Sequence, residues 1–83
     1  MDDSRIIDLF FARAESAIGA LDRKYGRLCS RTANNILGNP QDAEECVNDS
    51  YLGVWNRVPP TKPDSLRAFL LRILNNICTE RLR

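Results

Sequence analysis

Apolar residues recur every three or four positions along most of this chain. That spacing is typical of helices that bury one face, whereas no segment alternates apolar and polar residues as a half-buried strand would. The pattern predicts helices over about 5–12, about 15–37, 40–57 and from 64 or 65 to the end. We therefore expect an all-α fold, a compact four-helix domain with a short first helix and three longer ones.

Each predicted helix has an apolar stripe that we expect to form the core. The stripes comprise Ile6, Ile7, Leu9, Phe10 and Phe11; then Ile18, Leu21, Tyr25, Leu28, Cys29, Ala33 and Ile36; then Ala43, Val47, Tyr51 and Val54, with Trp55 at the margin; and finally Leu66, Phe69, Leu70, Ile73 and Ile77.

Signals for the ends of helices support these boundaries. Gly38 stands where a C-cap glycine belongs, and Asn39 followed by Pro40 is typical of a helix start. The segment 58–63 contains three prolines, which cannot continue a helix and keep the chain extended and stiff.

Length and composition limit the possible function. A chain of 83 residues forms one domain, and a domain of this size buries little more than ~60% of its unfolded surface, so a large catalytic cleft is not expected. No apolar run approaches the ~20 residues of a membrane-spanning helix. The acidic start, Met1-Asp2-Asp3-Ser4, does not begin a signal peptide, so we expect a cytoplasmic location.

The residue types available argue against an enzyme. Histidine is absent, which excludes histidine acid–base catalysis, histidine-containing nucleophile triads and histidine-containing zinc sites. There is no glycine-rich phosphate loop. The cysteines Cys29, Cys46 and Cys78 are odd in number and widely spaced, so buried reduced thiols are expected, with a redox switch as the alternative. We predict no catalytic residue, cofactor or metal.

A net charge of only +1 conceals two oppositely charged segments. Residues 39–56 contain four acids and no base, whereas residues 57–83 contain six bases and two acids. This asymmetry indicates either two different partners or one surface that answers the other within the fold.

The charged residues of the third and fourth helices gather on single faces at 100° per residue. Asp42, Glu45 and Asp49 form one face, which is either solvated or docks a basic protein surface; a metal site would need ligands from another segment. On the fourth helix the face consists of Arg72, Asn76, Thr79 and Arg83, with Asn75 beside it. That face is either a solvated surface or one that contacts phosphates and base edges.

The proline segment also has two interpretations. It is either a rigid connection between helices or a stiff rim that receives an unstacked base from a single strand. The residues that would form such a rim are Arg57, Thr61, Lys62, Ser65 and Arg67.

The order of these features resembles region 2 of bacterial sigma-70-family RNA polymerase sigma factors, and most closely the extracytoplasmic-function (ECF) group. The fragments that match the family pattern are Ile36-Leu37-Gly38-Asn39, Asp42-Ala43-Glu44-Glu45, Asn48-Asp49, Tyr51, Trp55, Ser65-Leu66-Arg67-Ala68-Phe69-Leu70, Ile73, Asn76 and Glu80-Arg81-Leu82-Arg83. The resemblance covers about residues 5–83.

The resemblance implies a transcription initiation factor domain with two partners. It places docking to the β′ clamp helices of core RNA polymerase on Asp42, Glu45, Asn48 and Asp49. It places recognition of the promoter minus-ten element, as melted non-template strand, on Arg57, Thr61, Lys62, Ser65, Arg67, Arg72, Asn75, Asn76 and Thr79. An anti-sigma factor would cover the same surfaces. The alternative is a helical protein-interaction module or polymerase-docked regulator with this fold and no promoter recognition.

Some residues depart from the family pattern. Asn48-Asp49 replaces the usual glutamine–glutamate pair, Asn75 stands where an arginine is frequent, and Glu80-Arg81 replaces aspartate–arginine. These departures leave the expected fold intact and bear on which promoter bases are recognised. We expect residues 1–83 to form a single region 2 domain. We expect the second domain of a complete factor, region 4, which reads the minus-thirty-five element, to be absent from this chain. We interpret the chain as an isolated domain, with a truncated protein as the alternative.

Overall fold

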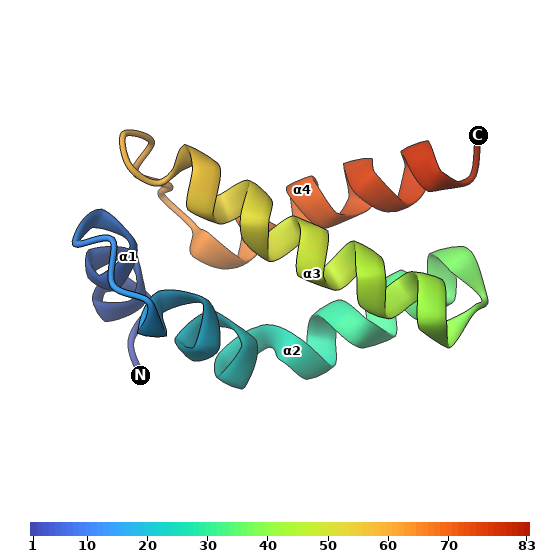
Figure 1. Ribbon diagram of the computed structural model, residues 1–83, viewed down its shortest axis with the longest axis horizontal. Helices are drawn as coiled ribbons and strands as arrows, with labels where there is room; N and C mark the ends of the chain where they lie inside the picture. Colours follow the sequence, from blue (N-terminus) through green and yellow to red (C-terminus); the bar gives the residue numbers. More distant parts are fainter.

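The computed structural model describes all 83 residues and contains four helices and no strands. They are α1 (Asp3–Phe11), α2 (Ser16–Leu37), α3 (Pro40–Arg57) and α4 (Leu66–Arg81) (Figure 1). The predicted all-α class and the four elements are confirmed, with boundaries that differ by one or two residues. None of the helices combines the length and the apolar character needed to cross a bilayer.

The predicted helix ends form through local hydrogen bonds. Gly38 ends α2 in the left-handed conformation, with φ of 66°, where glycine lacks the steric penalty of other residues. The Asn39 side chain accepts hydrogen bonds from the backbone N–H groups of Gln41 and Asp42, and so caps α3. Ser65 caps α4 in the same way by accepting from the backbone N–H of Ala68 at 3.2 Å.

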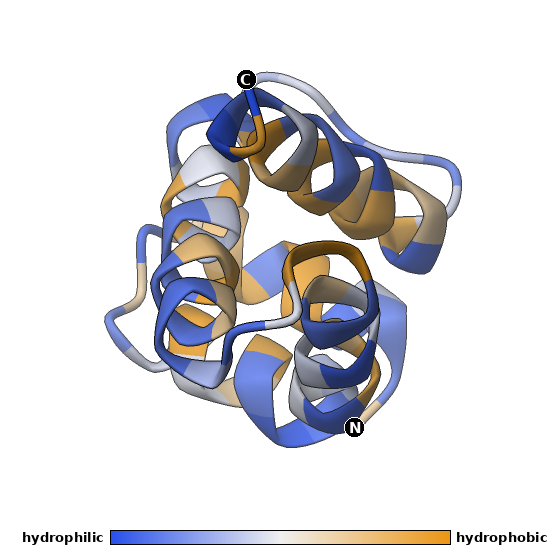
Figure 2. Cartoon of the chain, turned by 90° about the vertical axis from the view of Figure 1, so that its right-hand side faces the viewer, coloured by the Kyte–Doolittle hydropathy of each residue, from blue (hydrophilic) through white to orange (hydrophobic).

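The three longer helices pack against one another. In Figure 1, α3 runs between α2 and α4, and α1 lies at the N-terminal end of α2. In the end view of Figure 2, hydrophobic residues are found mainly on the sides of the helices that face one another. The α3–α4 connection projects from one end of the bundle (Figure 1).

The core confirms the predicted stripe on α3 and corrects the other three. All four stripe residues of α3 are buried. Phe11 of α1 is 41% exposed. On α2, Ala17 and Ala20 are buried although the prediction omitted them, and four of the predicted residues are only partly buried: Ile18, Tyr25, Leu28 and Ile36. On α4, Leu74 and Cys78 are fully buried, although the prediction omitted them, while Phe69 and Ile77 are only partly buried. The physical reason is that α4 packs against both α2 and α3, so its buried face is wider than one stripe.

The three cysteines are free thiols in this core. Cys29, Cys46 and Cys78 are each fully buried, as expected for small apolar residues. Ser50, the one buried polar residue, donates its hydroxyl hydrogen to the carbonyl oxygen of Val47 at 2.6 Å, so no buried polar side chain lacks a partner.

Candidate functional site

The acidic residues of α3 lie on the face that points away from the core. Glu45, Asn48 and Asp49 are exposed, and Asp42 is partly exposed at the N-terminal end of the helix. The buried residues of α3 share one side of the helix, which faces the core. At 100° per residue these four polar side chains lie on the opposite side, which faces outward. We refer to these residues together with Leu52 as the α3 face.

Leu52 was missed by the sequence analysis. Its side chain is 52% exposed, and at 100° per residue it falls between Asn48 and Asp49 on the helix circumference. An apolar side chain surrounded by polar ones resembles the anchor and rim of protein interfaces. Leu52 breaks the polar run of the outer face, and this is the signal that would have found it.

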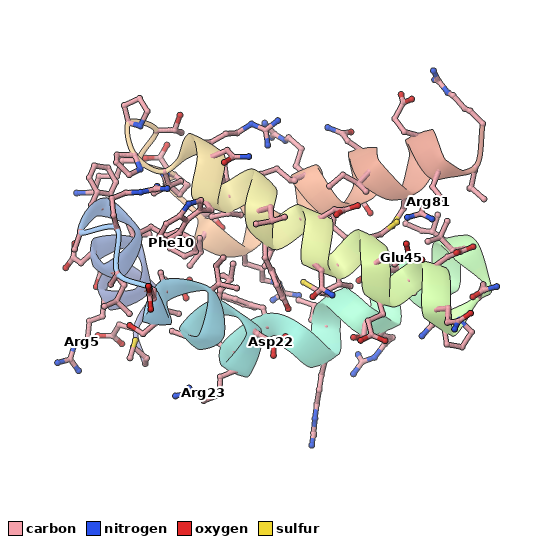
Figure 3. All side chains as sticks on the ribbon, in the orientation of Figure 1. Arg5, Phe10, Asp22, Arg23, Glu45 and Arg81 are labelled. Carbon is pink, nitrogen blue, oxygen red and sulfur yellow. The ribbon has the colours of Figure 1, made fainter.

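Part of the negative charge of the α3 face is neutralised by a basic residue of the same domain. Arg81 extends from α4 and places its guanidinium nitrogens 3.5 Å from an Asp42 carboxylate oxygen and 3.7 Å from one of Glu45 (Figure 3). Both pairs are exposed to solvent and therefore contribute little to stability. Asp49 has no such partner, so the unanswered negative charge lies toward the middle of the helix.

Most of the polar face of α4 is exposed and unpaired; the exception is Arg83, whose guanidinium lies 3.6 Å from a carboxylate oxygen of Glu80. Arg72, Asn75, Asn76 and Thr79 are all exposed, and none of these side chains forms a hydrogen bond or ion pair with the rest of the protein. Arg81, which reaches toward α3, lies half a turn away from Arg72 on the helix circumference. The polar face of α4 therefore points away from α3.

The proline segment adjoins this face at one point. A hollow at the start of α4 is lined by Pro63, Asp64, Ser65, Ala68, Phe69 and Arg72. The structure thus brings Ser65 and Arg72 together, as predicted. Ser65 also has a structural role, because its hydroxyl oxygen caps α4.

The other basic residues near the segment do not form a single rim. Lys62 lines a separate hollow that contains Asp3 and Asp8 of α1, so acidic groups lie on its side of the loop. Arg67 lies near Tyr25 of α2: burial and the hydrogen bond to Asp3 raise the pKa of Tyr25 to about 12, and the positive charge of Arg67 opposes that rise. Arg57 and Thr61 are exposed.

One side chain that no sequence signal identified holds the proline segment. Arg13 lies in the turn between α1 and α2, with a φ of 54° that non-glycine residues adopt rarely. Its guanidinium stacks 3.7 Å from the ring centroid of Trp55 and donates to the carbonyl oxygens of Trp55 at 2.7 Å and Val58 at 3.0 Å. Phe10 meets the same ring edge to face, with centroids 6.0 Å apart.

Comparison with known families adds to this geometry. The model of the sigma-70 region 2 family matches residues 21–83, from the first half of α2 to the end of the chain. The chain belongs to the sigma-70 region 2 family. Region 2 is the part of a sigma factor that is involved in RNA polymerase binding and promoter recognition, and it is a non-catalytic domain. No curated protein and no solved structure matches the chain.

The region 2 match includes every residue predicted for polymerase docking and DNA binding. It excludes α1 and the turn that holds Arg13. The contact between Arg13 and Trp55 therefore joins a segment outside the matched part to the last turn of α3 inside it.

Proposed function

We propose that this region 2 domain docks on the β′ clamp helices of core RNA polymerase through the α3 face. We further propose that it holds the melted non-template strand of the minus-ten element with the proline segment and the polar face of α4. This assigns polymerase binding to Asp42, Glu45, Asn48 and Asp49, and it adds Leu52 as the apolar centre of the contact.

The observation that carries the docking proposal is the composition of the α3 face. An exposed leucine lies among Glu45, Asn48 and Asp49, and Asp49 has no internal partner. A single exposed leucine is common on protein surfaces, so the support comes from its position beside unpaired Asp49 on one face of the helix. A basic partner surface with an apolar patch would bury Leu52 and neutralise Asp49 together.

The DNA part of the proposal rests on unpaired donors. Arg72, Asn75, Asn76 and Thr79 offer side-chain hydrogen bonds that the protein itself does not use. These are residue types that contact phosphates and base edges. Capturing flipped bases in a protein pocket offsets their unstacking, a cost of a few kcal/mol, so melting requires no bond chemistry. The hollow beside Arg72 is the favoured position for such a base; Lys62, which lies toward the α1 acids, is the least favoured of the proposed contacts.

The finer features of the assignment follow from the same proposal. Residues 1–83 would act as one region 2 domain of the ECF type in the cytoplasm, where core polymerase and promoter DNA are found. A region 4 domain would supply minus-thirty-five recognition, and an anti-sigma factor would compete for the α3 face.

Calorimetric titration of the chain with the isolated β′ clamp-helix fragment tests the docking. We expect Asp49→Lys to weaken binding by about tenfold or more, because a like charge then faces the basic partner. Glu44→Lys makes the same charge change on the same helix. Glu44 lies about 140° around the helix from Asp49, in a polar hollow against α2 whose edge toward the α3 face is Asn48, so the affinity of this variant should stay within about twofold of the parent chain.

Two results would contradict the proposal. Equal losses in Asp49→Lys and Glu44→Lys would show a response to net charge and not to the α3 face. No binding by a chain that circular dichroism shows to be folded would favour the alternative, an interaction module that shares this fold and has a different partner.

A further inference from the structure

The outward face of α2 has a row of arginines outside the surfaces already described. Arg23, Arg27 and Arg31 follow one another at every fourth residue, so they drift by only about 40° per step around the helix and span about 12 Å along its axis. All three are exposed, and Figure 3 shows Arg23 pointing away from the bundle. We call these three residues the α2 row.

The arginines of the α2 row are not neutralised by ion pairs with acidic residues of the domain. None of its arginines forms an ion pair; the bases that do are Lys24, Arg81 and Arg83. Asp22, the acid beside the row, accepts a hydrogen bond from the Tyr51 hydroxyl at 2.7 Å on the side facing α3. The row therefore presents three free guanidinium groups against one carboxylate that is already engaged.

The groove that contains the row shows which kind of partner fits it. Its lining consists of Asp22, Arg23, Lys24, Gly26, Arg27, Ser30 and Arg31, with no hydrophobic and no aromatic side chain. A protein partner would need an apolar centre, such as Leu52 provides on the α3 face. A single-stranded nucleic acid would need aromatic rings on which its bases stack. Neither is available, which leaves a regular array of phosphates.

We propose that the α2 row binds the sugar–phosphate backbone of duplex DNA without reading its sequence. Each phosphate of one strand lies 3.4 Å further along the duplex axis and is also rotated about that axis, so a straight row of ~12 Å faces about two or three phosphates of the same strand. Arginine presents a planar fork that suits phosphate oxygens, and Ser30 adds a hydroxyl donor in the same groove. The proposal goes beyond minus-ten recognition, because the row lies on α2 and not on the proline segment or α4.

Fluorescence anisotropy with a fully paired 20-base-pair duplex of arbitrary sequence, measured over a series of salt concentrations, tests this. Each phosphate contact contributes about 0.9 to the slope of log K against log salt. We expect Arg27→Gln/Arg31→Gln to reduce the slope by about two and the affinity several-fold at low salt. Arg27→Glu should lower the slope by about one, whereas Arg5→Glu, the same charge change on α1, should leave it unchanged.

Three outcomes would overturn the proposal. The first is an unchanged slope in the double variant. The second is an equal loss in Arg27→Glu and Arg5→Glu, which would reflect net charge alone. The third is a wild-type chain that binds poly-glutamate but not the duplex, which would assign the row to an acidic protein. The duplex contains no unpaired bases, so failure here is separate from failure of minus-ten recognition.

Discussion

At the residue scale, Arg13 does more than any other single side chain to join distant segments. It stacks on Trp55 and donates to two carbonyl oxygens at the end of α3, where the helix leaves acceptors without intrahelical donors. A positive charge there also suits the helix dipole. Its positive φ belongs to the ending of α1, where the N–H groups of Arg13 and Ala14 donate to the carbonyl oxygens of Phe10 and Leu9 at 3.0 Å each.

We expect Arg13→Ala to lower the free energy of unfolding by about 1–2 kcal/mol, through loss of the cation–π contact and two charge-assisted hydrogen bonds at a partly exposed position. In a domain of this size each kcal/mol lowers Tm by about 4–8 °C. Arg13→Lys keeps the positive charge but lacks the planar guanidinium, so its Tm should lie between those of the parent chain and Arg13→Ala. Thermal unfolding followed by circular dichroism checks the order; an unchanged Tm in Arg13→Ala would contradict the role.

The thiols give a second prediction at this scale. Burial raises the pKa of Cys29 to about 11, and the nearby negative charge of Asp22 adds to the rise. Burial also raises the pKa of Cys78 to about 11, and the neighbouring Cys46 thiol adds to that rise. Folded chain at pH 8 should therefore react slowly with a thiol reagent, whereas all three thiols should react rapidly in denaturant. Rapid labelling of one thiol in the folded chain would revive the redox-switch alternative.

The same pKa values predict how stability depends on pH. An unfolded thiol ionises near its ordinary pKa of 9.0, whereas the folded Cys29 and Cys78 thiols ionise near 11. The unfolded chain thus loses protons first, and the contribution of both thiols to stability is present below pH 9 and declines between about pH 9 and 11. Denaturant titrations across this range should show a smaller decline in Cys78→Ala than in the parent chain, relative to each protein at pH 8. An equal decline would contradict it.

At the element scale, α3 and α4 approach closely at Gly53. A Cβ atom added there would lie 2.9 Å from Cγ2 of Ile73, a methyl group attached to the branched Cβ of a buried residue on α4. In contrast, a Cβ at Gly19 of α2 would meet nothing within 4 Å. Close packing against α4 therefore requires a glycine at position 53, whereas packing does not require one at position 19.

We expect opposite results from the two alanine substitutions. Gly19→Ala should stabilise the domain by about 0.5–1 kcal/mol through helix propensity alone. Gly53→Ala gains the same propensity but forces Ile73 to move, at a cost of about 1–3 kcal/mol, so the net change should be destabilising. Comparison of the two midpoints in urea checks this; a higher midpoint for Gly53→Ala would show that α3 and α4 can separate without cost.

At the scale of the whole molecule, the charged residues divide among separate surfaces. The α3 face is acidic around Leu52, the polar face of α4 adjoins the proline segment, and the α2 row is basic. Each points outward from a different helix of the same core. The overall charge of +1 thus results from cancellation between surfaces suited to different partners.

This separation predicts that DNA and polymerase binding can be lost independently. Arg72→Ala and Asn76→Ala should each reduce transcription from a mapped cognate promoter by about fivefold or more, because the loss of a hydrogen-bonding contact to a base or phosphate costs about 1–3 kcal/mol. Their affinity for the β′ clamp-helix fragment should equal that of the parent chain. A variant that loses both activities together, or that unfolds, would show its residue to be structural.

Much of the fold was predictable from the sequence because its signals are local. The periodicity of the stripes, the Asn39-Pro40 start, the C-cap at Gly38 and the prolines after α3 each act within a few residues, and the structure confirms them. The sequence also determined which residues share a face of α3 or α4, since helix geometry alone sets that. Its resemblance to sigma-70 region 2 was confirmed by the family match over residues 21–83.

Only the tertiary structure decided which of these residues meet across helices. It brings Arg81 close to Asp42 and Glu45, which partly neutralises the acidic face, and it places Lys62 in the same hollow as Asp3 and Asp8 of α1. It joins Arg13 to Trp55 and Val58 across more than 40 residues, and it buries Leu74 and Cys78 between two neighbouring helices. These contacts depend on how the elements cross and rotate about their axes, which is set by packing against the other helices and leaves no mark in a helix's own pattern.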